Sequence, residues 1–144
     1  MKKILLAFLL LSTAPQVAAQ EWKNDIDKAL REAASINKKV MLFFTVSEQC
    51  DNCSALDRNV FRSEEFRDYA KENYILVKID FSQKPTEELT DKMIEKNLLI
   101  IEKYNKDGFF PLVVILNKDA KVLGKAGVYK DESPSQFVKM LRNF

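Results

Sequence analysis

Cys50 and Cys53, the only two cysteines of the sequence, form a Cys-Asp-Asn-Cys motif that could exchange disulfide bonds. The motif follows the apolar run 40–46 and precedes a segment of helical spacing, so we expect Cys50 in the first turn of a helix. A thiol at that place faces unpaired backbone N–H groups and the positive end of the helix dipole, which favour the thiolate. The spacing of three puts Cys53 on the same face, where it could attack a mixed disulfide formed at Cys50. The pattern therefore predicts a redox-active pair, with Cys50 as nucleophile and Cys53 as resolving thiol.

Three other interpretations of the cysteine pair compete with this one. A structural disulfide suits an exported protein, although a loop with two intervening residues constrains the unfolded chain little. A metal site would need further ligands, and the sequence has no His and no other Cys. Two unpaired cysteines do not suit an oxidising compartment. We favour the redox-active pair, predict no metal, and keep the structural disulfide as the alternative.

Residues 1–19 have the pattern of a secretory signal peptide. Lys2 and Lys3 precede an apolar run of 8 residues, Ile4 to Leu11, and the small residues Val17-Ala18-Ala19 follow. An apolar run of that length is far short of the roughly 20 residues that span a bilayer, so we expect no stable membrane insertion. The sequence thus predicts cleavage after Ala19, a periplasmic or secreted location, and one domain over residues 20–144.

The composition supports a single globular domain and excludes several classes of function. The 144-residue chain is 47% hydrophobic and 31% charged, which is enough apolar content for a core. Removing Lys2 and Lys3 from the 23 basic residues leaves 21, equal to the 21 acidic residues. A neutral chain with interleaved charges lacks the basic surface of a nucleic-acid-binding protein. The absence of His excludes imidazole acid–base catalysis and Cys-His pairs.

Hydrophobic spacing predicts alternating helices and strands. In the first half of the chain we expect a helix carrying Trp22, Ile26, Ala29, Leu30 and Ala33, strand Val40–Val46, helix Cys50–Asn59, a helix capped by Ser63, and strand Tyr74–Phe81. A further helix should open at Pro85 and Thr86, with Leu89, Met93, Ile94, Leu98 and Ile101 on one face. We then expect strand Leu112–Leu116, an antiparallel edge strand within 121–128, and a last helix capped by Ser133 with Pro134 at its first position. This order predicts an α/β fold with a central sheet covered by helices on both faces.

A second element of interest is Phe110-Pro111, which lies just before strand 112–116. Proline tolerates a cis peptide bond better than other residues, and it also suits the first position of a strand. From these residues alone, a trans proline that starts the strand is the favoured interpretation.

The cysteine motif with its neighbours resembles the thioredoxin superfamily over residues 22–144. The residues that carry the resemblance are Phe44-Thr45-Val46-Ser47-Glu48-Gln49-Cys50-Asp51-Asn52-Cys53, then Leu56-Asp57 and Val60-Phe61, together with Phe110-Pro111. The chain is similar in particular to the periplasmic domain of the transmembrane disulfide reductase and to the anterior-gradient proteins.

The resemblance implies a thioredoxin-like fold, a central mixed sheet flanked by helices on both faces, in which Cys50 attacks a protein disulfide and Cys53 releases the product. It also implies that Pro111 is cis, lies against the pair and, with Phe110, shapes the groove for substrate backbone. No bound cofactor is implied. A redox partner protein or a membrane electron carrier would reset the cysteines, and the sequence does not define an oligomeric state.

Departures from the family pattern bear on the mechanism. Gln49 stands where Trp is common, and Phe43 and Phe44 occupy the region of the usual buried acid. Glu48 is a candidate substitute for that acid, although a solvated loop position is the favoured interpretation. The charge of Asp51 opposes the thiolate at Cys50, which makes the couple more reducing. We therefore expect a disulfide reductase or isomerase; the alternative is a non-catalytic binding module with a structural Cys50–Cys53 disulfide.

Overall fold

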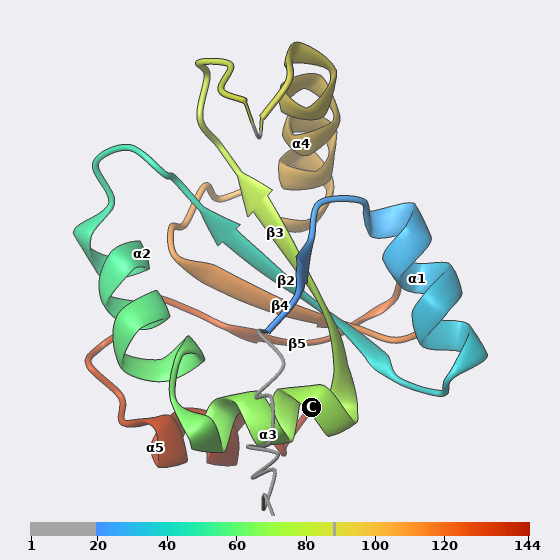
Figure 1. The fold of residues 1–144 in the computed structure, drawn as a ribbon, viewed down its shortest axis with the longest axis vertical. Coiled ribbons are helices and arrows are strands. Elements are labelled where there is room, and N and C mark those ends of the chain that lie inside the picture. Colours follow the sequence, from blue (N-terminus) through green and yellow to red (C-terminus); the bar gives the residue numbers. More distant parts are fainter. Residues whose placement is uncertain (1–19, 88) are drawn as a thin grey trace, which may run out of the picture.

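The computed structural model describes residues 20–87 and 89–144, which form a five-stranded mixed sheet with helices on both faces (Figure 1). In chain order the elements are β1 (Trp22–Lys23), α1 (Ile26–Ser35), β2 (Lys39–Thr45), α2 (Asp51–Leu56), the π-helical turn η1 (Asp57–Phe61), α3 (Glu64–Asn73), β3 (Tyr74–Asp80), α4 (Asp91–Tyr104), β4 (Leu112–Leu116), β5 (Val122–Ala126) and α5 (Pro134–Leu141). The predicted signal peptide lies outside the described residues. Within them, no helix is long and apolar enough to cross a membrane.

The sheet has the strand order β1-β3-β2-β4-β5. β1 and β2 run parallel to β3, whereas β4 is antiparallel to both β2 and β5. Parallel neighbours need crossover connections, and helices α1, α2 and α3 lie in those connections. The carboxyl ends of β2 and β3 therefore meet at one edge of the sheet, and the Cys-x-x-Cys segment leaves β2 at this edge. The predicted fold class is confirmed.

Alternate residues of β2 fill two separate cores. Met41 and Phe43 pack with residues of α2, η1, α3 and α5 on one face of the sheet. Val40, Leu42 and Phe44 pack with residues of α1 and α4 on the other. All five side chains are at most 4% exposed, because a strand covered on both faces is apolar throughout.

Side-chain caps set where several helices begin. Ser63 accepts a hydrogen bond from the backbone N–H of Phe66 at the start of α3. Ser133 and Gln136 form a reciprocal capping box at the start of α5, with Pro134 in the first turn. Both predicted caps are confirmed.

The first predicted helix is wrong at its start. Trp22 lies in β1, where it pairs with Leu76 of β3, and its ring centroid is 5.2 Å from that of Phe61. Asp25 caps α1 by accepting from the N–H groups of Asp27 and Lys28, so the helix begins at Ile26. The apolar spacing that joined Trp22 to the helix belongs to two elements.

The helix predicted from Pro85 also differs from the structure. α4 begins at Asp91, because the hydroxyl of Thr90 accepts from the N–H of Met93. Its buried face is formed by Asn97, Ile100 and Tyr104, whereas Leu98 is 43% exposed. The amide of Asn97 donates to the carbonyl of Asp80 at 3.1 Å, and this bond turns the polar Asn97, not Leu98, toward the sheet.

Other boundaries move by a few residues. The strand predicted to end at Val46 ends at Thr45, and the one predicted to end at Phe81 ends at Asp80. The edge strand covers only 122–126, with a register irregularity opposite 115–116. The helix predicted over 50–59 begins after Cys50 and continues as the π-helical turn to Phe61.

Candidate active site

The two cysteines form a disulfide at the start of α2, with their Cα atoms 5.2 Å apart. Cys50 is the N-cap residue, and its Sγ accepts a hydrogen bond from the backbone N–H of Cys53 at 3.2 Å. In the reduced protein the same N–H group is placed to stabilise a thiolate at Cys50. Cys53 is 3% exposed and packs with Leu56 in the core, whereas Cys50 is only half-buried. Of the two cysteines, Cys50 is therefore the more exposed residue.

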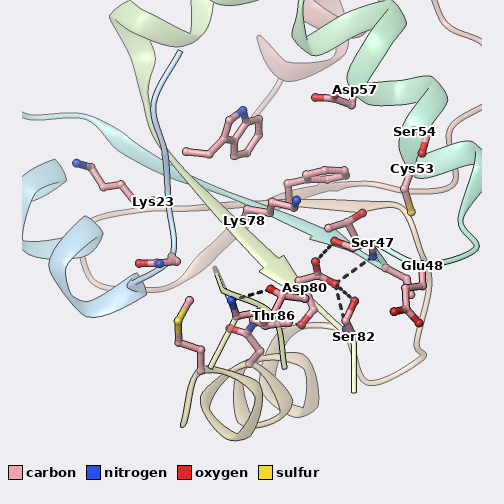
Figure 2. A pocket seen from close by; sticks show the side chains of 18 of the residues that line it. Lys23, Ser47, Glu48, Cys53, Ser54, Asp57, Lys78, Asp80, Ser82 and Thr86 are labelled. Atoms are coloured by element: carbon pink, nitrogen blue, oxygen red, sulfur yellow. Dashed lines mark hydrogen bonds between the residues drawn. The ribbon is translucent and has the colours of Figure 1, made fainter. Parts of the chain in front are cut away.

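The loop between β2 and α2 is held to the sheet by Asp80, at the end of β3. The carboxylate accepts hydrogen bonds from the backbone N–H of Ser47 at 3.1 Å and from the Ser47 hydroxyl. It also accepts from the N–H and the hydroxyl of Ser82, at 3.0 and 2.7 Å (Figure 2). Burial by itself would raise the pKa of Asp80, but the hydrogen bonds from Ser47 and Ser82 outweigh it and lower the pKa. Asp80 thus fixes the segment that leads to Cys50.

Three loop and helix positions near the pair are solvent-exposed. Gln49 has a left-handed φ of 65°, a conformation that disfavours bulky and β-branched residues. Glu48 lies on the surface with its carboxylate 4.0 Å from Lys84, which agrees with the solvated interpretation. Asp51 occupies the first turn of α2, beside Cys50.

The Phe110–Pro111 peptide bond is cis, as the resemblance implies and against what the residues alone favour. The register that pairs Leu112 with Phe44 brings Pro111 to the end of β2 from which the cysteine loop departs. Phe110 stacks on Phe81, with ring centroids 5.4 Å apart and planes at 19°. Phe109 is 51% exposed. The predicted groove residues thus lie at the same edge of the sheet as Cys50.

The buried amide of Asn105, which was not predicted as a site residue, holds the loop between α4 and β4. Asn105 is 1% exposed; its Nδ2 donates to the carbonyl of Phe109 at 2.8 Å, and its Oδ1 accepts from the N–H of Phe109 at 3.0 Å. Nothing in the sequence pattern separates Asn105 from the neighbouring polar turn residues, so the signal is visible only in the fold.

A cavity of about 690 Å³ opens beside the resolving cysteine (Figure 2). Cys53 borders it from α2, Lys78 and Asp80 border it from β3, and the rings of Trp22 and Phe43 form part of its wall. Neither Lys78 nor Asp80 was predicted as a site residue. Their signal was two charged residues at alternate positions of an otherwise apolar strand. Among the described residues, no group of three or more His, Cys, Asp or Glu could hold a metal ion.

Residues 26–144 match the thioredoxin-like domain family, and the chain belongs to that family. The fold carries a Cys-x-x-Cys pair at the start of α2 and a cis proline just before β4. The protein is accordingly a thiol–disulfide oxidoreductase of the thioredoxin fold.

Among individual proteins, the chain is similar to the disulfide bond reductase DsbH of Chlamydia pneumoniae, with 29% identity over 118 residues that cover 82% of this chain and 69% of that protein. A solved structure of a DsbH oxidoreductase superposes with a TM-score of 0.77 and 26% identity, over 95% of this chain and 92% of the other. The oxidised C-terminal domain of DsbD from Neisseria meningitidis shares the fold, with a TM-score of 0.60 and 16% identity over 85% of this chain and 97% of that domain.

Proposed function

We propose that this protein reduces disulfide bonds in exported proteins. Cys50 attacks a substrate disulfide to form a mixed disulfide, and Cys53 then attacks Cys50 and releases the reduced substrate. The observation that carries the proposal is the partly exposed Cys50 at the helix start, beside the buried Cys53. The similarity to a disulfide bond reductase supports the direction of electron flow.

Phe110 and Pro111 form the second part of the proposed site. They lie at the same edge of the sheet as Cys50, and the exposed ring of Phe109 adds an apolar surface next to them. An extended or unfolded substrate segment would lie along this edge, with its disulfide at Cys50. Because no reductant is built into the chain, the pair is reset by a redox partner protein or a membrane electron carrier. The signal-peptide pattern of residues 1–19 supports a periplasmic or secreted location.

The charge of Asp51 favours the reducing direction. A carboxylate next to Cys50 disfavours its thiolate, and a less stable thiolate makes the couple more reducing. Asp51→Asn should therefore make the reduction potential more positive. An unchanged or more negative potential in this variant would show that the charge of Asp51 does not make the couple more reducing.

Insulin reduction and substrate trapping test the proposal together. The wild-type protein, supplied with a small dithiol, should reduce insulin, Cys50→Ser should be inactive, and Cys53→Ala should accumulate mixed disulfides with exported proteins through Cys50. Ser135→Ala, at an exposed position of α5, is the matched control and should keep full activity. The alternative of a non-catalytic module predicts no insulin reduction and no trapped substrate.

A further inference from the structure

The cavity that Cys53 borders is separate from the edge where a substrate segment would lie. Its lining does not include Cys50, Phe110 or Pro111. Its volume of about 690 Å³ lies within the range of roughly 300–1,000 Å³ that is common for small-molecule sites. Disulfide exchange at Cys50 gives this cavity no role, so its own chemistry indicates what it could hold.

The wall that the sheet contributes is partly aromatic. Phe43 of β2 and Trp22 of β1 both line the cavity, and their ring centroids are 5.6 Å apart. Both rings also pack against the buried Phe61, which holds them in place. Fixed aromatic rings on a cavity wall offer a surface against which a planar apolar group can pack.

The same wall carries a buried hydroxyl group. Thr45 lies two residues after Phe43 on β2, so its side chain points to the same face of the sheet. Thr45 is 4% exposed and lines the cavity. Its backbone carbonyl accepts a hydrogen bond from the N–H of Phe81, but no residue in the described part of the chain forms a hydrogen bond with its hydroxyl. Buried hydroxyl groups usually have a partner, so this one is available to a ligand in the cavity.

Most charged groups around the cavity already have partners. Ion pairs or hydrogen bonds hold Lys23 to Glu21 and Glu32, Arg62 to Asp57, Glu48 to Lys84, and Asp80 to Ser47 and Ser82. Within residues 20–87 and 89–144, the cavity-lining charged residues that make no ion pair or hydrogen bond are Lys78 and Arg58. Both are cations, so the charge that the cavity leaves unneutralised is positive and favours an anion.

The two unpaired cations reach the cavity from different elements. Lys78 lies on β3 beside Phe43 of β2, so its side chain emerges on the face that α2 covers (Figure 2). β1 ends with Lys23 opposite Val77, one position before Lys78, and Lys78 is exposed. Arg58 lies in η1, the π-helical turn that continues α2. Turns of this kind are frequent at functional sites.

We propose that this cavity binds a small organic anion that carries a planar apolar group. The apolar group packs against the rings of Trp22 and Phe43, the positive charges of Lys78 and Arg58 attract the acid group, and the Thr45 hydroxyl donates a hydrogen bond to the ligand. Binding of this kind involves no covalent step. The inference goes beyond disulfide reduction and does not depend on it.

A titration with 2-naphthoate, followed by nuclear magnetic resonance of the ¹⁵N-labelled protein, tests the proposal. Trp22 is the only tryptophan of the chain, so one indole N–H signal reports on the aromatic wall. That signal and the amide signals of Thr45 and Lys78 should shift saturably, with a Kd of about 0.1–1 mM for a ligand of this size. The neutral analogue 2-naphthalenemethanol should bind about fivefold more weakly, the size expected for one charge in a solvated cavity.

Substitutions separate the contributions of charge and hydrogen bonding. Lys78→Met should weaken binding of 2-naphthoate about fivefold and leave binding of the alcohol unchanged, whereas Lys78→Arg should bind 2-naphthoate like the wild type. Thr45→Val keeps the shape of the side chain without its hydroxyl and should weaken binding of 2-naphthoate about fivefold. Lys118→Met, the matched control, removes a charge from the exposed turn at the opposite end of the sheet and should change neither affinity.

Several results would overturn the proposal. They are the absence of a saturable shift, shifts confined to Phe109 and Phe110, equal affinity for the acid and the alcohol, and an equal loss of affinity in Lys118→Met. Insulin reduction tests a different surface of the protein. A protein that reduces insulin but does not bind 2-naphthoate would overturn this inference alone, and one that binds 2-naphthoate but does not reduce insulin would overturn the proposed function alone.

Discussion

Replacing Asp80 tests whether its carboxylate anchors the loop that leads to Cys50. Asp80 accepts hydrogen bonds from the backbone N–H and hydroxyl groups of both Ser47 and Ser82. Asp80→Ala removes the acceptor, so these donor groups must form hydrogen bonds with water or remain unsatisfied. Asp80→Asn keeps the shape but presents an amide N–H₂ group, with no acceptor capacity, toward part of the donor set.

The size of the effect follows from the number and exposure of these bonds. A hydrogen bond to a charged group contributes about 1.5–3 kcal/mol when well buried. Asp80 is only half-buried, so solvent screening reduces the contribution of each bond, and we expect a total loss of about 2 kcal/mol in the free energy of unfolding. For a domain of this size, that loss corresponds to a Tm about 5–10 °C lower.

The loss should depend on pH in a defined direction. Because the folded-state pKa of Asp80 is lowered from its ordinary 3.8, the anchor stabilises the fold above about pH 4, and this stability disappears as pH falls through the folded pKa. Urea unfolding at neutral pH should therefore show a large gap between wild type and Asp80→Asn, and at about pH 3 the gap should narrow.

Asp119→Asn, on the exposed β4–β5 turn, is the matched control and should leave stability unchanged at both pH values. Equal stability of wild type and Asp80→Ala at neutral pH would refute the anchor. A gap that stays constant down to low pH would show that the ionised carboxylate is not its source.

Three further substitutions probe the scaffold and the second loop. Phe61→Ala, which removes a ring packed against four neighbouring rings, should cost about 3–5 kcal/mol in urea unfolding; a loss below about 1 kcal/mol would contradict the packing argument. Asn105→Ala removes both hydrogen bonds to the backbone of Phe109 and should lower kcat/KM for insulin reduction by about tenfold, while the Cys50–Cys53 reduction potential stays constant. An unchanged kcat/KM would refute a role of this loop in substrate binding. Ser133→Ala breaks the capping box with Gln136 and should cost about 1 kcal/mol, recovered in part by Ser133→Asp; no loss in thermal unfolding would count against the cap.

Sequence patterns predicted the strands and several caps well because each depends on local chemistry. The buried strands are continuous apolar runs, and Ser63 and Ser133 precede helices with the hydroxyl that a first turn requires. Trp22 could not be assigned correctly in this way. Its spacing to Ile26 fits a helix, and only pairing with Leu76 on a distant strand shows that it belongs to the sheet.

The site was predictable to the extent that its chemistry is carried by residue type. Cys50 and Cys53 stand out by identity, and the resemblance alone pointed to a cis Pro111. Asp80 was not predicted, because its role depends on the loop residues Ser47 and Ser82, which only the fold brings next to its carboxylate. The available signal was a charged residue in a strand that the sequence predicts to be covered on both faces, where charged residues are rare.

The π-helical turn that follows α2 has a consequence for how the protein can be used repeatedly. Val60 and Phe61 are adjacent in sequence, yet both are fully buried, so the far end of the cysteine helix is clamped in the aromatic core. The disulfide itself closes a ring too small to restrict the unfolded chain much. We therefore expect reduction and re-formation of the Cys50–Cys53 disulfide to leave the scaffold folded, so that one molecule can complete repeated catalytic cycles without refolding.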